Sequence, residues 1–142
     1  MEKSTLILWL LTITLWGICP IIEKIGLKNV DPLLALFIRT SAALIGLSLA
    51  VFLTGAFKPE VLNLKNIAVL SLSGILGGFL GMLTYFTLLK SQNASQIVPL
   101  TSVYPLVSTL FAILFLKEEL HIVKILAVFL IVSGIFLLFK NP

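Results

Sequence analysis

Hydrophobic residues dominate five long stretches of the chain, at residues 4–22, 33–54, 67–89, 96–116 and 122–139. Each stretch has about the 20 mostly apolar residues that an α-helix needs to cross a bilayer core of about 30 Å. Short joints with lysine, asparagine, glycine and proline separate the stretches, and these joints favour turns. The pattern predicts an all-α integral membrane protein, a single domain over residues 1–142 in which five antiparallel transmembrane helices form a bundle.

The composition strengthens this prediction and excludes several functions. Hydrophobic residues make up 59% of the chain, charged residues 11%, and the mean hydropathy is +1.17, far from the values of soluble domains. With one histidine, one cysteine and no nucleotide-binding loop, we expect no catalytic site, no metal and no cofactor. The net charge of +4 is spread over helix ends, so nucleic acid is not an expected partner.

Lysine and arginine residues are balanced across the expected membrane. One side carries Lys3, Lys58, Lys65, Lys117 and Lys124, and the other carries Lys24, Lys28, Arg39, Lys90 and Lys140. An excess on one side normally fixes the orientation of a membrane protein. The balance is either the noise of a small sample or a sign of dual topology, in which two opposed copies form an antiparallel homodimer of ten helices. Such a pair would reproduce the inverted-repeat architecture of many transporters.

The first stretch has two distinct faces at 100° per residue. The polar and aromatic face carries Trp9, Thr12, Trp16, Pro20 and Glu23. We expect this face to point into the bundle. Glu23 has two interpretations: a solvated residue near the interface that pairs with Lys24 or Lys28, or a deeper carboxylate that exchanges protons.

The second stretch holds the one arginine of the chain. Arg39 shares a face with Ala35, Ala43, Gly46 and Ala50, and small residues let a neighbouring helix approach closely. Arg39 lies two turns beyond Pro32, roughly 10 Å by helical rise. It therefore either extends to the headgroups or holds an anionic group in a water-filled cavity.

Small residues mark one face of the third stretch, which ends at a tyrosine. This face carries Ser71, Gly74, Gly78, Gly81 and Tyr85. Such glycines more often serve tight helix packing than ligand binding. The Tyr85 hydroxyl is a candidate to face a cavity.

The fourth stretch combines hydroxyl groups with two prolines. One of its faces carries Thr101, Tyr104, Pro105 and Ser108. Proline has no N–H, so Pro99 and Pro105 deprive the carbonyls of Ser95 and Thr101 of their helical donors. In hydrocarbon these carbonyls need a partner from protein, water or ligand. The pattern fits a helix that lines a solute pathway, and it also fits a kink that neighbouring helices satisfy.

Several short motifs resemble the EamA domain of the drug/metabolite transporter superfamily. The carboxyl-terminal part carries Ala94-Ser95, Val98-Pro99-Leu100, Tyr104-Pro105-Leu106 and the run Leu-Phe-Leu-Lys-Glu-Glu-Leu at residues 114–120. The amino-terminal part adds Trp16-Gly17, Lys24, Asp31-Pro32 and Arg39. The resemblance spans the whole chain. It departs at Lys117, where the family often has glycine, and at Glu23, where an apolar residue is common.

The resemblance implies a transporter of small metabolites, amino acids or drug-like solutes, multi-pass in the plasma membrane of a prokaryote and surrounded by lipid. Longer family members hold two such domains in inverted orientation around a central cavity. This chain is therefore expected to need a partner, either an inverted second copy or another half-transporter. Alternatives are a lipid-carrier flippase, a small multidrug exporter or a non-transporting membrane subunit.

By analogy with the family, the cavity would draw on the first, third and fourth helices. The residues expected to contact the solute are Trp16, Tyr85, Thr101, Tyr104 and Ser108. Arg39 joins them as the candidate for an anionic group, and Glu23 is the candidate for proton coupling. Pro20, Pro99 and Pro105 are the expected helix-breaking positions.

Overall fold

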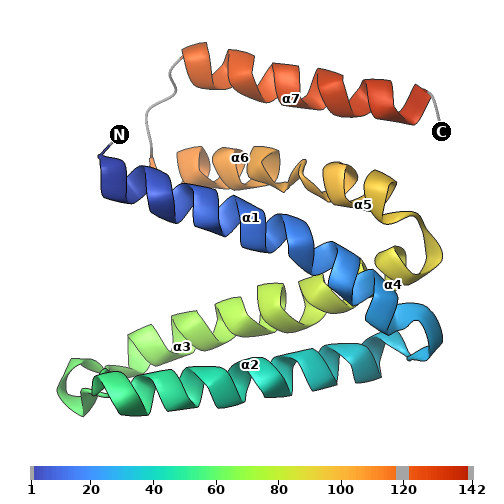
Figure 1. Ribbon diagram of the computed structural model, residues 1–142. Helices are drawn as coiled ribbons and strands as arrows, with labels where there is room; N and C mark the ends of the chain where they lie inside the picture. Colours follow the sequence, from blue (N-terminus) through green and yellow to red (C-terminus); the bar gives the residue numbers. More distant parts are fainter. Residues whose placement is uncertain (1, 118–121, 141–142) are drawn as a thin grey trace. The chain divides into compact units, whose positions relative to one another are not determined.

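The computed structural model describes residues 2–117 and 122–140 (Figure 1). The acidic pair Glu118-Glu119 of the 114–120 motif lies outside these residues. The described residues form helices and turns, with no strand among them. The helices fall into two compact units, Met1–Ser91 and Gln92–Pro142.

Four helical segments are long and apolar enough to cross a membrane, and a fifth apolar helix is shorter. The four are Lys3–Asn29, Pro32–Thr54, Leu64–Ser91 and Ala94–Leu116, and the shorter one is Ile125–Leu137. At most 6% of each spanning window is buried, so these helices present apolar side chains over most of their surface. The prediction of an all-helical membrane protein is confirmed to this extent, while the five-helix bundle stays a prediction.

The first helix continues into a 3₁₀ turn, and a two-residue break separates this turn from the second helix. α1 (Lys3–Gly26) runs through Pro20 and continues into the 3₁₀ turn η1 (Leu27–Asn29). α2 (Pro32–Thr54) begins at Asp31, whose carboxylate accepts the Leu33 N–H at 2.9 Å. Pro32 occupies the first turn, where its missing N–H costs nothing. The Asp31-Pro32 pair therefore fixes where the second helix begins.

Glycine closes the second helix, and asparagine opens the next one. Gly55 adopts the left-handed conformation at φ 61°, and the Ala56 N–H donates to the Val51 carbonyl at 3.2 Å, as in a common helix-ending motif. A short 3₁₀ turn, η2 (Pro59–Val61), follows. The Asn63 side chain then accepts the Asn66 N–H at 2.8 Å, which caps α3 (Leu64–Ser73).

The third span changes its helical form in the middle. α3 gives way to a π-helix, η3 (Gly74–Gly81), and then to α4 (Met82–Ser91). In a π-helix each N–H donates to the carbonyl five residues earlier rather than four. Side chains beyond η3 are therefore rotated relative to a continuous α-helix, and the glycine face inferred at 100° per residue does not run unbroken to Tyr85.

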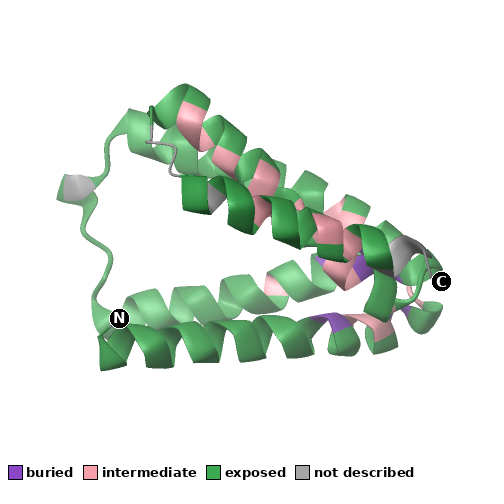
Figure 2. Ribbon diagram, turned by 90° about the horizontal axis from the view of Figure 1, so that it is seen from above, coloured by how far each residue is buried: buried purple, intermediate pink, exposed green. Residues whose placement is uncertain are grey.

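The core of the first unit lies where α1, η1, α2 and α4 meet (Figure 2). The buried side chains there are Pro20, Leu27, Leu36, Phe86 and Leu89. Burial is confined to this end of the unit, and the remaining lengths of α1, α2 and α3 are exposed. Without water to drive apolar association in a membrane, close packing and polar contacts must hold this end together.

The second unit contains the fourth predicted span, which is broken in two. α5 (Ala94–Thr101) ends at a turn over Ser102 and Val103, and α6 (Tyr104–Leu116) starts with Pro105 in its first turn. The Thr101 hydroxyl donates to the Ile97 and Val98 carbonyls at 3.0 Å each. The Ser102 hydroxyl also donates to Val98, at 3.0 Å. The hydroxyls next to the break thus satisfy carbonyls of their own helix.

The same unit ends with α7 (Ile122–Lys140), which packs against α5. Lys117 closes α6 in the left-handed conformation at φ 54°, a conformation that glycine adopts without strain. This explains why a glycine suits the position that departs from the resembling family. The lysine carries the conformational cost instead.

Gly81 is the position on which the π-helix depends most directly. A Cβ at Gly81 would lie 3.2 Å from the Leu76 carbonyl oxygen, whereas a Cβ at Gly78 would meet nothing within 4 Å. We expect Gly81→Ala to lower the free energy of unfolding by about 1 kcal/mol, and Gly78→Ala to be neutral or stabilising because alanine favours helices. Thermal unfolding in detergent, followed by tryptophan fluorescence, measures both. Equal effects of the two substitutions would show that this contact does not shape η3.

Candidate functional site

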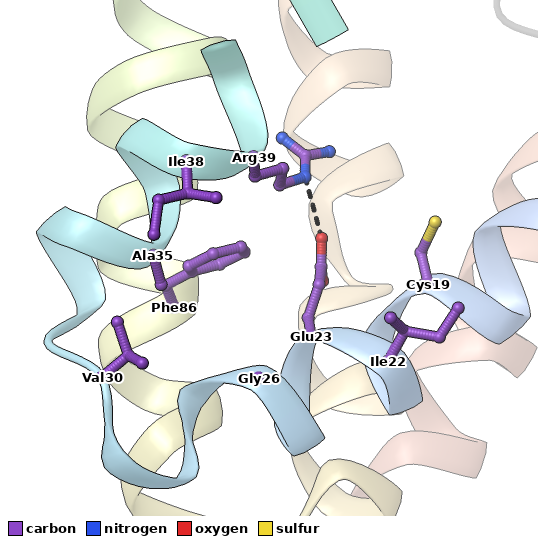
Figure 3. Close-up of a pocket in the computed structure, with 9 residues that line it drawn as sticks. All are labelled: Cys19, Ile22, Glu23, Gly26, Val30, Ala35, Ile38, Arg39 and Phe86. Carbon is purple, nitrogen blue, oxygen red and sulfur yellow. Dashed lines mark ion pairs between the residues drawn. The ribbon is translucent and has the colours of Figure 1, made fainter. Parts of the chain in front are cut away.

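An ion pair joins the end of the first helix to the second helix. Glu23 lies in the last turn of α1, and Arg39 lies two turns into α2. The Arg39 Nε and Glu23 Oε1 atoms are 2.9 Å apart (Figure 3). The Glu23 side chain is 12% exposed and the Arg39 side chain 45%. The carboxylate is thus shielded, while much of the guanidinium stays accessible.

The pair borders a pocket of about 420 Å³ that lies within the first unit (Figure 3). Its apolar walls are Ile22, Val30, Ala35, Ile38 and Phe86. Cys19 and Gly26 complete the lining on the α1 side. Pockets that hold small organic molecules typically measure about 300–1,000 Å³ and combine apolar walls with a few polar groups. This pocket has that size and that composition.

Aromatic residues of α4 form the floor beneath the arginine. The Arg39 Cζ atom lies 6.0 Å from the centre of the Phe86 ring, a cation–π distance. Phe86 is almost fully buried, so its ring is a fixed surface. Tyr85 is half-buried with its ring 6.2 Å from that of Phe86. Three helices therefore contribute to the charged site.

Two lysines fasten the helix ends beside the pocket. The Lys24 ammonium donates to the Leu89 and Lys90 carbonyls at 2.6 and 3.1 Å, and the Lys90 ammonium donates to the Val30 carbonyl at 2.9 Å. The last carbonyls of a helix have no intrahelical donor, and a lysine there also complements the helix dipole. Together these hydrogen bonds tie α1, the α1–α2 joint and α4 to one another.

The structure brings some of the predicted site residues together. Glu23 and Arg39 are paired, Tyr85 contacts the ring of the pocket residue Phe86, and Pro20 is buried one turn before Glu23. Trp16 lies two turns before Glu23 with its side chain 68% exposed. The remaining candidates belong to the second unit, where Thr101 and Pro105 are half-buried, Tyr104 and Ser108 are exposed, and Pro99 lies inside α5.

Sequence patterns indicated parts of this site but not its pairings. Ala35 and Arg39 both line the pocket, as their shared helical face suggested. One of the two interpretations of Glu23 paired it with Lys24 or Lys28, whereas the structure pairs it with Arg39. The contact of Phe86 with Arg39 and the hydrogen bonds of the two lysines were not predicted. Each joins residues about 50 to 65 positions apart in the sequence.

The described residues offer no evident metal site. Within that part of the chain, no three His, Cys, Asp or Glu side chains come together as metal ligands could. Cys19 is a free, exposed thiol in the pocket lining. The groups that the pocket itself presents are the ion pair, this thiol and apolar side chains.

These features define a small multi-pass membrane protein with a charged pair in an interhelical pocket. The model of the EamA-like transporter family matches residues 3–140. The chain therefore belongs to the EamA-like transporter family, and its general function is that of a membrane transporter. The resemblance noted in its short motifs is confirmed.

Relatives with related names span both bacteria and archaea. An "uncharacterized transporter in cobO 3′ region" of a Sinorhizobium species is 30% identical over 91% of this chain and 92% of its own. An uncharacterized protein of Methanocaldococcus jannaschii is 29% identical over 95% and 96%. An "uncharacterized transporter" of Archaeoglobus fulgidus is 29% identical over 89% of this chain but 45% of its own. No solved structure matches the chain significantly.

The Glu23–Arg39 pair should appear as an energetic coupling in a double-mutant cycle. We expect Glu23→Gln and Arg39→Gln each to destabilise the protein, and the double substitution to cost about 1 kcal/mol less than their sum. Reversible unfolding in detergent provides the four free energies. A parallel cycle of Glu23→Gln with Lys28→Gln is the control, and its coupling should be near zero. Coupling to Lys28 in place of Arg39 would contradict the observed pairing.

Proposed function

We propose that this chain is a half-transporter in which the pocket between α1, α2 and α4 forms part of the solute pathway. The observation that carries the proposal is a shielded carboxylate and an accessible guanidinium beside about 420 Å³ of mostly apolar space. Ionisable residues are costly within membranes and tend to mark solute or proton pathways. The solutes are small metabolites, amino acids or drug-like molecules, and the membrane is the plasma membrane of a prokaryote.

We also propose solute contacts for residues with exposed or half-buried polar groups in each of the two units. These are Trp16, Tyr85, Thr101, Tyr104 and Ser108. The break between α5 and α6 supports this assignment, because irregular backbone at membrane depth is tolerated where it is buried in protein or lines a cavity. The Thr101 hydroxyl donates to carbonyls of its own helix, so it can meet a solute only as an acceptor, whereas Tyr104 and Ser108 are exposed.

The functional assembly in this proposal is an antiparallel homodimer. Two facts support it: lysine and arginine are balanced across the predicted spans, and the matched Archaeoglobus fulgidus relative is more than twice as long as the region it shares. Inverted repeats around a midplane site are a common transporter architecture. A different half-transporter as partner is the alternative assembly.

Glu23 is the proposed coupling group for protons. It faces Arg39 of α2 and lies within electrostatic range of Tyr85 of α4, with Cys19 on its own helix. Protonation of Glu23 would release the Arg39 guanidinium from its partner. Protonation of Glu23 would therefore strengthen the attraction of the site for an anionic group, which couples solute binding to proton binding.

Transport by the purified protein in lipid vesicles tests this function. Uptake is measured against a panel of amino acids, organic acids and drug-like cations, with and without a pH gradient. For the accepted solute, we expect Arg39→Gln to reduce uptake about tenfold, because a charge-assisted hydrogen bond contributes about 1.5–3 kcal/mol. Lys28→Gln removes the same charge from the same side and should leave uptake unchanged.

Two outcomes would redirect this proposal. Gradient-independent behaviour across the whole panel would favour the non-transporting subunit. Movement of lipid-linked substrates or of cations alone would favour the flippase or the multidrug exporter.

Dual topology predicts that both orientations are present in one membrane. A protease-cleavable tag at either terminus should be cut from outside in roughly half of the molecules, and single cysteines at the two ends should cross-link copies in opposed orientation. Adding two lysines to the 56–62 joint should shift the population towards one orientation. A single orientation for the unmodified chain would rule out the antiparallel homodimer.

A further inference from the structure

The accessible charge of the pocket is positive. Arg39 exposes 45% of its side chain, whereas its partner Glu23 exposes 12%. More of the guanidinium than of the carboxylate side chain is therefore accessible to a solute. An anionic group is attracted to this surface, and a cationic group is repelled by it.

The guanidinium also keeps its preferred binding edge available. Glu23 contacts the Nε atom, and Figure 3 shows the two terminal amino groups on the side of the guanidinium away from Glu23. An arginine fork carries five N–H donors and binds a carboxylate through two parallel hydrogen bonds. The Phe86 ring, 6.0 Å from the Arg39 Cζ atom, supports the flat guanidinium in this position. A second carboxylate can bind without displacing the first.

The rest of the pocket favours an apolar body on that solute. Ile22, Val30, Ile38 and Phe86 supply the walls, and aliphatic and aromatic carbons offer no hydrogen-bond partners to hydroxyl or amide groups. Burying such groups there without partners would cost free energy. The volume of about 420 Å³ suits a compact molecule rather than a two-chain lipid.

We infer that the pocket binds a small carboxylic acid with an apolar body, its carboxylate held by the terminal amino groups of Arg39 and its body against Ile22, Ile38 and Phe86. The inference rests on the proposed function, since it names the solute class of the proposed pathway. An anionic lipid headgroup shares the same charged chemistry, so the experiment separates the two sources.

Cys19 provides a direct readout of pocket occupancy. It is the single cysteine of the chain, it is exposed, and it lines the pocket. The purified full-length protein is placed in phosphatidylcholine vesicles without any gradient, and the rate of Cys19 labelling by a maleimide dye is measured. The added compounds are 4-methylpentanoate, its uncharged amide and the amine of the same carbon skeleton.

We expect 4-methylpentanoate to slow Cys19 labelling, and the amide to need about a tenfold higher concentration for the same protection. The amine should give none. Arg39→Gln should abolish protection by the acid, Arg39→Lys should weaken it because lysine lacks the fork, and Lys28→Gln should retain it. Equal protection by acid and amide, or undiminished protection in Arg39→Gln, would overturn the inference.

Two further measurements keep the result interpretable. Tryptophan-monitored unfolding of each variant shows whether it is folded, and the comparison of acid with amide on the unaltered protein needs no variant at all. The unfolding measurement also detects binding independently of labelling, because a bound ligand raises the unfolding temperature. If the acid raises it no more than the amide does, the inference fails.

Repeating the labelling in vesicles that contain phosphatidylglycerol tests the lipid source. Arg39-dependent protection by this lipid, without added acid, would assign the site to a headgroup and refute the solute assignment. Because these experiments measure binding alone, a protein that binds the acid but does not transport it would refute the proposed function and leave the binding site standing.

Discussion

The organisation of the first unit depends on the hydrogen bonds that the Lys24 and Lys90 ammonium groups donate to backbone carbonyls. Each lysine reaches from one helix to backbone carbonyls of another element, at the end where Leu27, Phe86 and Leu89 are buried. In hydrocarbon, the carbonyls at a helix end have few other donors. The packing of apolar side chains alone would distinguish weakly between protein and lipid neighbours, so these polar contacts select the arrangement.

This fastened end places the ion pair and the pocket. Glu23 can meet Arg39 because the 27–31 joint turns the chain back sharply and the lysines hold α4 beneath it. Phe86 then supports the guanidinium from α4. Away from this end, α1, α2 and α3 bury few side chains, so the unit is secured at one end and open along most of its length. Such a form leaves large apolar surfaces exposed on these helices.

Helix irregularity is the second recurring feature, and it arises from glycine and proline in different ways. The glycines of η3 permit the wider π-helix because a side chain at Gly81 would crowd the Leu76 carbonyl. Pro105 instead starts a new helix after the turn at Ser102 and Val103. Nearby hydroxyls satisfy the carbonyls around that turn. Both irregularities therefore arise from residues within their own segments.

The sequence by itself determined the membrane location, the positions of the apolar helices and their Asp31 and Gly55 boundaries, because hydropathy, capping and backbone conformation are local properties. It also singled out Glu23, Arg39 and Tyr85 as polar residues in apolar stretches. Only the tertiary structure decided that Glu23 pairs with Arg39 and that Phe86 lies near the guanidinium. It also decided that the Lys24 and Lys90 ammonium groups donate to backbone carbonyls of distant segments. The π-helix was likewise not predicted, because the faces of the helices were derived at 100° per residue, the value for an α-helix. Such pairings depend on how the joints bring distant helices together, and no periodicity within one helix contains that information.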